Sequence, residues 1–405
     1  MISVAIVSRS NATGGGASRI AEDLAEWLSK KDTNTVHFCA LPEGELKPFQ
    51  LPLYPPHLLG KLSRTTHRLT HHLGLKELVP VEFFSTLIHQ LSHFDVVHFH
   101  DLNWAISPLS IRLCSARKPA VFTAHDCSCF TGGCIYPLQC EGFLNKCGDC
   151  PQLNSMGASF DFTSFNIRIN RWLAVKNNIQ YIFPSKWLLE IASKSLHFGK
   201  IAKVIPNGFV SEKYEFCSKT EARRKLGICS EKKVVLVAAH YLADPRKGLK
   251  FALAAIRAIT DLSPLVIFVG IPPPDLETLI SGVSFWLSGF VKEPKRLGLL
   301  MVAADVFLFP SLQDNFPIMI QEALVAGTPI VGFAVGGISE MVDHGATGFL
   351  CEAEDQSALN RNLRNSLSRN NLIDSGMTAR DSMRRRFDMD VFGLQHLSIY
   401  EELVK

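Results

Sequence analysis

Two carboxylates with the potential to do chemistry lie in the stretch from residue 305 to residue 352. Asp314 follows an apolar run, Val306 to Phe309, that stops at Pro310-Ser311, and Glu322 comes eight residues after Asp314. Carboxylates at this spacing can act as a general acid and base, or accept hydrogen bonds from the hydroxyl groups of a sugar. Which chemistry applies depends on the elements that position the two side chains.

The surrounding pattern predicts the edge of a parallel sheet. An apolar strand leads into the turn that carries Asp314, and Glu322 stands on a helix with an apolar face. A second strand, Pro329 to Phe333, ends before Gly336-Gly337. Open α/β sheets bind ligands beyond the carboxyl ends of their strands, so we expect a ligand at this edge.

A basic pair, Arg246-Lys247, follows another predicted strand, Val234 to Ala239. It lies in the segment from His240 to Gly248, which connects that strand to a helix. Guanidinium and ammonium groups at this point can clamp a diphosphate. The alternative is ordinary solvated charge on a surface loop, but the position beyond a strand end favours binding.

Three consecutive glycines, Gly14, Gly15 and Gly16, separate an apolar run, Ser3 to Ser8, from an amphipathic helical pattern. Backbone N–H groups and the helix dipole at such a loop can hold a phosphate or a sugar. The loop is neither the G-x-G-x-x-G dinucleotide fingerprint nor a P-loop, because no Gly-Lys-Ser/Thr follows. A simple tight turn is the alternative.

Two histidine-aspartate pairs follow two further predicted strands. His100-Asp101 ends the run DVVHFH, and His125-Asp126 follows the run PAVFTA. Polar residues just beyond parallel strands face the ligand crevice, and the repeat of the arrangement favours a site role for His125 over a structural one.

Six cysteines lie between residues 127 and 153. Four of them have the spacing C-x5-C-x6-C-x2-C, which predicts a closed, structural zinc site: Cys134, Cys140, Cys147 and Cys150. Free thiols or a disulfide pair are the alternatives. Four thiolate ligands would leave no open coordination position, so we do not expect a catalytic metal here. Cys127 and Cys129 are not assigned.

The whole chain has the size and composition of a two-domain globular protein. It has 405 residues, is 47% hydrophobic and 20% charged, and carries a net charge of +4. This small excess of positive charge does not indicate nucleic-acid binding, although it suits an anionic substrate. Strands alternate with helices in both halves, which predicts two Rossmann-like, doubly wound parallel sheets. We expect domains over residues 1–209 and 234–385, a linker region over 210–233, and a final helix over 386–405 that can pack on the N-terminal domain.

The segment from Leu58 to Leu78 predicts a basic amphipathic helix. Such a helix can lie on an anionic membrane surface or hold an anionic acceptor, and the alternative is a solvated face over a core stripe. No apolar run is long enough to span a membrane, and the N-terminus resembles a first strand more than a signal peptide. We therefore expect a cytoplasmic protein, with a peripheral position at the inner face of the membrane as the alternative.

With these motifs in order, nearly the whole chain resembles the family 4 glycosyltransferases. The phrase QDNFPIMIQEALVAGTPIVGF and the cysteine-rich segment are most similar to the branch that builds bacterial envelope polysaccharides. The resemblance implies the GT-B architecture, with two domains that face a central cleft. It also implies a retaining hexosyltransferase that moves a sugar from a UDP- or GDP-linked donor to a glycan or lipid-linked acceptor. The N-terminal domain would bind the acceptor, the C-terminal domain would bind the donor, and catalysis would require no metal.

The resemblance also implies roles for single residues. Arg246 and Lys247 match the basic pair that binds the diphosphate, and His125 matches the histidine next to the donor sugar. Glu322 matches the glutamate that binds the ribose, whereas Asp314 replaces the family's sugar-binding glutamate with a side chain one methylene shorter. The remaining donor contacts fall on the glycine loop, Gly14, Gly15 and Gly16, and on Asn315, Phe316, Pro317 and Ile318.

Three other functions remain open at this point. A GT-B nucleotide-sugar epimerase would use the same donor site. A glycoside hydrolase would use Asp314 and Glu322 as its carboxylate pair, but this function gives Arg246 and Lys247 no role. A non-catalytic carbohydrate-binding or scaffold protein would keep the fold without turnover, and the aspartate at position 314 favours it slightly.

Overall fold

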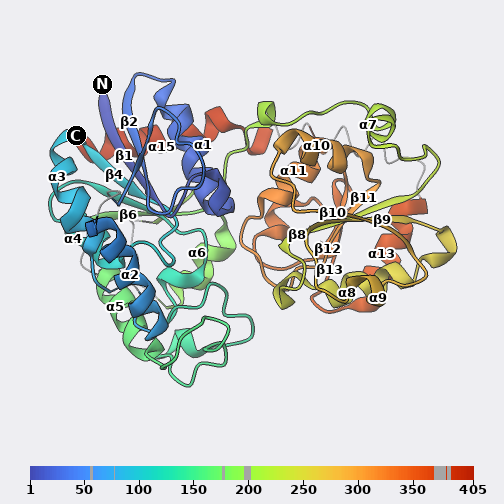
Figure 1. Ribbon diagram of the computed structural model, residues 1–405, viewed down its shortest axis with the longest axis horizontal. Coiled ribbons are helices and arrows are strands. Elements are labelled where there is room, and N and C mark those ends of the chain that lie inside the picture. The colour runs from blue at the N-terminus through green and yellow to red at the C-terminus, as the bar shows by residue number, and fades with distance from the viewer. Residues whose placement is uncertain (55–57, 77, 176–177, 196–201, 369–379, 381–384) are drawn as a thin grey trace. The chain divides into compact units, whose positions relative to one another are not determined.

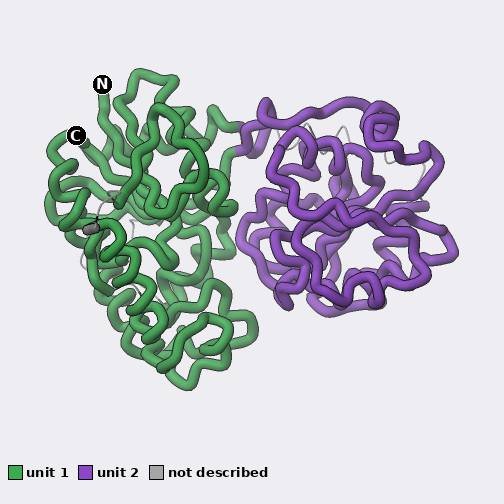
Figure 2. Tube along the Cα trace, in the orientation of Figure 1, with its two compact units in different colours: residues 1–208, 389–405 green, residues 209–388 purple. Residues whose placement is uncertain are grey.

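The computed structural model describes residues 1–54, 58–76, 78–175, 178–195, 202–368, 380 and 385–405. The chain forms two compact units (Figure 2). Unit 1 contains residues 1–208 and 389–405, and unit 2 contains residues 209–388. Each unit is an α/β domain with its own sheet, as the sequence pattern predicts.

Unit 1 is organised around a seven-stranded parallel sheet with the order β3-β2-β1-β4-β5-β6-β7. Figure 1 labels β1, β2, β4 and β6 of this sheet. The reversal of direction at β1 is the topology of a doubly wound fold, in which the strand order switches at the ligand crevice. Its strands are β1 (Ile2–Ser8), β2 (Thr33–Cys39), β3 (Gln50–Pro52), β4 (Val96–Phe99), β5 (Ala120–Thr123), β6 (Ile179–Phe183) and β7 (Ala202–Val204).

The helices of unit 1 follow the strands along the chain. They are α1 (Gly16–Ser29), α2 (Leu58–His72), α3 (Ile88–Gln90), α4 (Pro108–Ser115), α5 (Thr163–Val175) and α6 (Lys186–Ser193). Ser107 and Ser185 cap α4 and α6 by accepting backbone N–H bonds, which is why these helices begin where they do.

The C-terminal helix, α15 (Met389–Val404), packs against α1 and β4 of unit 1. The indole N–H of Trp27 donates to Asp390 over 2.6 Å. Gly393 lies against the Trp27 ring so closely that a Cβ there would come within 2.4 Å of it. The Tyr400 side chain is fully buried and hydrogen-bonds to His98. The helix α15 therefore packs as a part of unit 1, although it follows unit 2 in the sequence.

Unit 2 contains a six-stranded parallel sheet with the order β10-β9-β8-β11-β12-β13. Its strands are β8 (Val234–Tyr241), β9 (Leu265–Ile271), β10 (Ser284–Gly289), β11 (Val306–Phe309), β12 (Ile330–Phe333) and β13 (Gly348–Cys351). Its helices are α7 (Lys219–Leu226), α8 (Leu249–Arg257), α9 (Leu276–Leu279), α10 (Pro294–Ala303), α11 (Ile318–Ala326), α12 (Ile338–Met341) and α13 (Gln356–Ser368).

Alternate residues of these strands enter two separate hydrophobic cores, one on each face of the sheet. Leu236 and Phe307 pack with α10 and α11, whereas Val235 and Val306 pack with α8 and α13. Side chains of a strand point alternately to its two faces, so a strand covered by helices on both sides must be apolar throughout. This explains the unbroken apolar runs of β8 and β11.

The segment 210–233 is part of unit 2 and not a separate linker, which corrects our expectation from the sequence. It contains α7, and Arg223 on this helix is buried, with hydrogen bonds to Asp305 and to the carbonyl of Ala303. Its charged residues suggested a solvated linker because their buried partners lie about eighty residues away in the sequence. β3 lies in a proline-rich stretch that has no strand periodicity in the sequence.

Within the described ranges, no helix is both long and apolar enough to span a bilayer.

Candidate functional site

The basic pair of unit 2 lies in a tight turn at the carboxyl end of β8. Asp244 begins this turn by accepting the N–H of Arg246 over 2.9 Å. Gly248 ends it with φ +70°, and a Cβ at Gly248 would lie 2.0 Å from the carbonyl oxygen of Pro310. Only glycine tolerates both this backbone angle and this approach. The turn is thereby held against the end of β11, where the candidate carboxylate Asp314 follows.

Asp314 joins the basic pair directly. Its Oδ2 accepts hydrogen bonds from Lys247 Nζ over 2.5 Å and from Arg246 Nη1 over 3.1 Å. The Asp314 side chain is 9% exposed, and those of Arg246 and Lys247 are each 20% exposed. The sequence predicted that all three residues bind ligand. In the structure they form one partly buried ion cluster among themselves, and their binding of a ligand stays a prediction.

The charges of the cluster favour the ionised form of Asp314 and oppose the effect of burial on Lys247. Burial by itself raises the pKa of the Asp314 carboxyl, but the charges of Lys247 and Arg246 outweigh it and hold this pKa below its ordinary value. Burial lowers the pKa of Lys247, and Asp314 opposes that shift. A general acid must hold a proton at working pH, so the lowered pKa of Asp314 is unfavourable for the hydrolase alternative.

Glu322 lies in a different environment from Asp314. It is buried on α11, and its Oε1 accepts a hydrogen bond from the Tyr214 hydroxyl over 2.5 Å. Tyr214 comes from the segment that the sequence suggested was a linker, and it stacks between Phe209 and Phe216. Sequence reasoning missed Tyr214 because no motif connects residues that are 108 positions apart.

The predicted backbone contacts surround the start of α11. Asn315 and Phe316 are buried, Pro317 is the N-cap residue, and Ile318 begins the helix. The glycine pair after β12 packs on this turn: the N–H of Gly337 donates to the Asp314 carbonyl over 3.1 Å. The structure thus places Asn315, Phe316, Pro317 and Ile318 next to Asp314 at the start of α11, and their role in donor binding stays a prediction.

The glycine loop of unit 1 leads from β1 into α1. Gly15 has φ +109°, and α1 begins at Gly16. Gly14 is tightly packed, because a Cβ there would lie 2.4 Å from that of Ser10. The sequence prediction that this loop binds phosphate or sugar is therefore compatible with its local shape, but no observation of the structure tests it.

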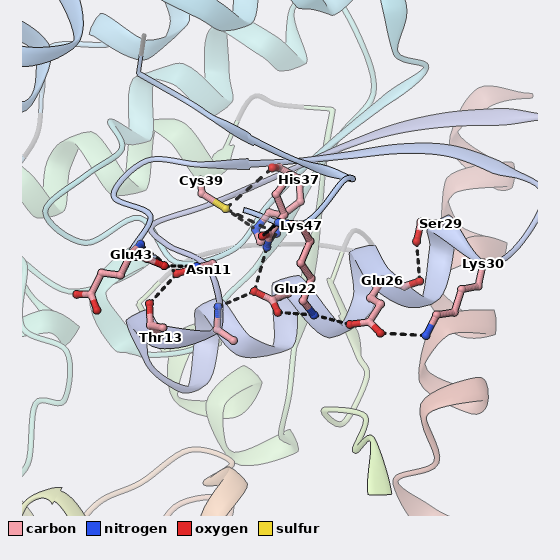
Figure 3. Close-up of polar contacts among 12 residues, drawn as sticks. Asn11, Thr13, Glu22, Glu26, Ser29, Lys30, His37, Cys39, Glu43 and Lys47 are labelled. Atoms are coloured by element: carbon pink, nitrogen blue, oxygen red, sulfur yellow. Dashed lines mark hydrogen bonds and ion pairs between the residues drawn. The ribbon is translucent and has the colours of Figure 1, made fainter. Parts of the chain in front are cut away.

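A buried polar network that sequence reasoning did not find supports this loop (Figure 3). Glu22 on α1 accepts the N–H of Ala12 over 2.7 Å, a salt bridge from Lys47 over 2.8 Å and a hydrogen bond from Gln50 over 3.0 Å. Burial raises the pKa of Glu22, but these donors, Lys47 first, bring it below its ordinary value. A negative charge under the loop thus fixes the backbone of its first turn.

His125 lies beyond the end of β5, and His100 lies beyond the neighbouring strand β4. Their rings stack with 5.2 Å between centroids, and His100 Nδ1 is 2.9 Å from His125 Nε2. Burial lowers the pKa of His125 to about 3, with a further contribution from His396. His125 is thus neutral at physiological pH and can hydrogen-bond to a sugar hydroxyl, whereas it offers no positive charge.

The four cysteines of the predicted zinc site surround one cavity of about 20 Å³, together with Phe143 and a few polar residues. None of the eleven cysteines, all of which lie in described ranges, forms a disulfide. Within those ranges no group of three or more His, Cys, Asp or Glu side chains is already arranged to hold a metal ion. Cys127, which the sequence left unassigned, belongs to the hydrophobic core.

The predicted basic helix is α2. Its His67 is buried and lies 3.0 Å from the buried Glu82, so this member of the basic set belongs to the core. The opposite face is exposed and mixes two leucines with basic residues: Lys61, Leu62, Arg64, Arg68 and Leu69.

Comparison with known proteins gives one consistent result. Residues 14–213 match the family model described as Glycosyltransferase Family 4, and residues 231–369 match the model described as Glycosyl transferases group 1. N-acetyl-alpha-D-glucosaminyl L-malate synthase of Bacillus anthracis is 23% identical over 57% of this chain and 64% of its own length. The putative colanic acid biosynthesis glycosyl transferase WcaC of Escherichia coli is 26% identical over 58% of this chain and 59% of its own length. The match to both curated relatives thus spans less than two thirds of their length.

A solved structure shows the same fold over the whole chain. Anabaena Alr3699/HepE, in complex with UDP-glucose, superposes with a TM-score of 0.67 at 19% identity, covering 99% of this chain and 100% of the other. At this level of identity the likeness establishes the architecture of the two units.

Proposed function

We propose that this chain, which belongs to the family 4 glycosyltransferases and has their GT-B fold, transfers a sugar from a nucleotide-sugar donor to a glycan or lipid-linked acceptor. The observation that carries the proposal is the convergence of Arg246, Lys247 and Asp314 at the carboxyl edge of the unit 2 sheet. The relative WcaC is named for colanic acid biosynthesis, which supports an envelope polysaccharide as the product.

In the proposed mechanism, Arg246 and Lys247 bind the diphosphate of the donor. Cleavage of the bond between the sugar and the diphosphate leaves negative charge on the phosphate oxygens, and two fixed cations stabilise that charge. The N-terminus of α11 adds backbone N–H groups from the turn at Asn315 and Phe316. Because protein cations supply this positive charge, the step as proposed requires no metal.

Glu322 would bind the ribose hydroxyls of the donor, since a carboxylate accepts two such bonds. The Tyr214 hydroxyl orients it by occupying Oε1. Asp314 would contact the transferred sugar while it holds Lys247 in place. In unit 1, we propose that neutral His125 hydrogen-bonds to a sugar hydroxyl and that the backbone of Gly14, Gly15 and Gly16 binds phosphate.

We propose retention of the anomeric configuration, with the acceptor attacking on the face from which the diphosphate departs. A departing phosphate oxygen would take the proton of the acceptor hydroxyl, so no side chain is assigned as general base. UDP is the first donor nucleotide to test, because the similar Alr3699/HepE is described in complex with UDP-glucose.

Unit 1 would bind the acceptor. The exposed face of α2, with Lys61, Arg64 and Arg68 beside Leu62 and Leu69, suits an anionic membrane surface that carries a lipid-linked acceptor. A cytoplasmic protein that associates with the inner face of the membrane would fit this surface.

A binding and transfer experiment tests the proposal. A panel of UDP- and GDP-linked sugars is added to the protein, and thermal unfolding and release of the nucleoside diphosphate are followed. At least one donor should raise the unfolding midpoint, since a ligand of the native state stabilises it. Glu322→Ala and Lys247→Ala should each abolish release while the protein stays folded. Lys250→Ala, a change of an exposed lysine three residues from Lys247, is the matched control and should leave the rate unchanged.

Two outcomes would contradict the proposal. If both site variants retain wild-type release of diphosphate, the donor site is elsewhere. If no sugar nucleotide binds, the scaffold alternative is the better one. Recovery of a converted sugar nucleotide in the absence of any acceptor would identify an epimerase.

A further inference from the structure

The segment between β5 and α5 has almost no regular structure of its own. From Ala124 to Phe162, all within the described ranges, it contains two 3-10 turns, Cys127–Cys129 and Gly142–Leu144, and neither a strand nor an α-helix. Phe130 and Phe143 anchor it to the core of unit 1, while most of the remaining residues are at least partly exposed. A loop of this length is uncommon in a compact domain and needs an additional constraint to hold one conformation.

We propose that Cys134, Cys140, Cys147 and Cys150 provide this constraint by binding one structural zinc ion. The four residues come from three separate turns of the segment, and they line a single cavity. Its volume of about 20 Å³ accommodates one particle of the size of a water molecule, so it suits a single ion. This site is independent of the proposed transferase reaction and takes no part in it.

Backbone N–H groups are aimed at three of the four sulfurs. Gly142 donates to Cys140 Sγ over 3.4 Å. Gln152 donates to Cys150, and Gly132 donates to Cys147. Gly142 and Gln152 each lie two residues after the cysteine to which they donate. Backbone N–H groups in contact with a sulfur fix its orientation, as the hydrogen bonds around metal ligands do.

The turn between Cys147 and Cys150 has an unusual backbone conformation. Cys147, Gly148 and Asp149 all have left-handed backbone angles, with φ of +51°, +94° and +50°. Two of them are not glycine, so this turn costs free energy that a local constraint must offset. Zinc bound to both ends of the turn would supply that constraint.

The charges around the four cysteines are also compatible with a bound zinc ion. Four thiols that bind Zn²⁺ release four protons and form a complex with a net charge of −2. Two cations stand nearby: Arg171, which donates to the carbonyls of Phe143 and Leu144, and Lys76, which donates to that of Ser128. Tetrahedral coordination by four thiolates favours zinc over harder cations such as Mg²⁺.

Within the described ranges, no group of three or more His, Cys, Asp or Glu side chains is already arranged to hold an ion. The proposal therefore includes an inward rotation of the cysteine side chains on binding. Without the ion, nothing draws four thiols together.

Metal analysis of protein purified without chelators tests the site. We expect about one zinc per chain, and its loss in Cys140→Ser and Cys150→Ser. Cys229→Ser, a change of an exposed cysteine outside the segment, is the matched control and should keep the zinc. A second measurement does not depend on the folding of the serine variants: Co²⁺ is titrated into wild-type protein that has been stripped of metal. It should produce an intense sulfur-to-cobalt absorption that saturates at about one equivalent.

Either of two results would overturn the proposal. One is purified wild-type protein that contains no zinc and binds no Co²⁺ although it is folded. The other is a disulfide between any two of the four cysteines in the native protein. Neither result bears on sugar transfer, so the site and the proposed function are tested separately.

Discussion

Replacing Asp314 with asparagine tests whether this residue is mainly a counter-ion for the basic pair. The change keeps the shape of the side chain and removes its charge. Lys247 then loses its buried carboxylate partner, whereas Arg246 keeps Asp244 at 3.2 Å. Removing one partner of a fully buried ion pair costs about 3–5 kcal/mol. The lysine side chain is 20% exposed, so water offsets part of this cost, and we expect a loss of about 2 kcal/mol.

Thermal unfolding with and without UDP gives the readout. For a unit of this size, about 2 kcal/mol corresponds to a midpoint lower by about 4–8 °C. The diphosphate should restore a counter-charge to Lys247, so UDP should stabilise Asp314→Asn more than it stabilises the wild type. A recovery of about 1.4 kcal/mol would make the Kd for UDP about tenfold lower. Asp244→Asn is the control: its side chain is 34% exposed, so it should lower the midpoint only slightly.

Two results would refute this reasoning. An unchanged midpoint in Asp314→Asn would show that the ion cluster contributes no stability. Weaker binding of UDP by the variant would show that Asp314 assists the binding of the diphosphate. The reasoning above requires instead that the Asp314 carboxylate and the diphosphate compete as counter-ions of Lys247. If Asp314 contacts only the transferred sugar, the variant should bind UDP as the wild type does and lose affinity for the sugar nucleotide.

Two further predictions concern the pH dependence of stability and the packing of the glycine pair. Burial lowers the pKa of His37, His125 and His396 to about 4, 3 and 4, so the unfolded chain binds more protons than the native state below about pH 6.5. The three histidines contribute to the free energy of unfolding above that pH, and this contribution is lost as the pH falls. We expect the free energy of unfolding to decrease by about 4 kcal/mol between pH 7.5 and 5.5. An unfolding midpoint that does not change over this range would contradict the prediction. Gly336 has φ +58°, and a Cβ there would lie 1.8 Å from the Asp314 carbonyl, so Gly336→Ala should lower the rate of transfer at least tenfold. Gly345→Ala, at φ +86° with nothing within 4 Å of its Cβ, should cost only backbone strain of about 1 kcal/mol, and equal effects of the two changes on transfer would argue against a special role of the Gly336 contact.

The sequence by itself determined the fold class and the position of the candidate donor site. Long apolar runs that alternate with helical segments identify strands covered on both faces. The runs that begin at residues 3, 95, 119, 234, 306 and 329 coincide with β1, β4, β5, β8, β11 and β12. Polar residues just beyond those runs, such as Lys247 and Asp314, must reach the same edge of a parallel sheet. The three-residue strand β3 has too few residues to show a pattern.

The tertiary structure alone decided which of these residues meet and what state each is in. Asp314 pairs with Lys247 across 67 positions of sequence, Glu322 meets Tyr214 across 108, and His98 meets Tyr400 across 302. Contacts of this kind depend on how separate segments pack, and local sequence carries no signal for them. A pKa likewise depends on burial and on neighbours brought in by the fold. For this reason the carboxylates that the sequence offers as a possible acid and base become, in the folded protein, a counter-ion for two cations and a hydrogen-bond partner of a tyrosine.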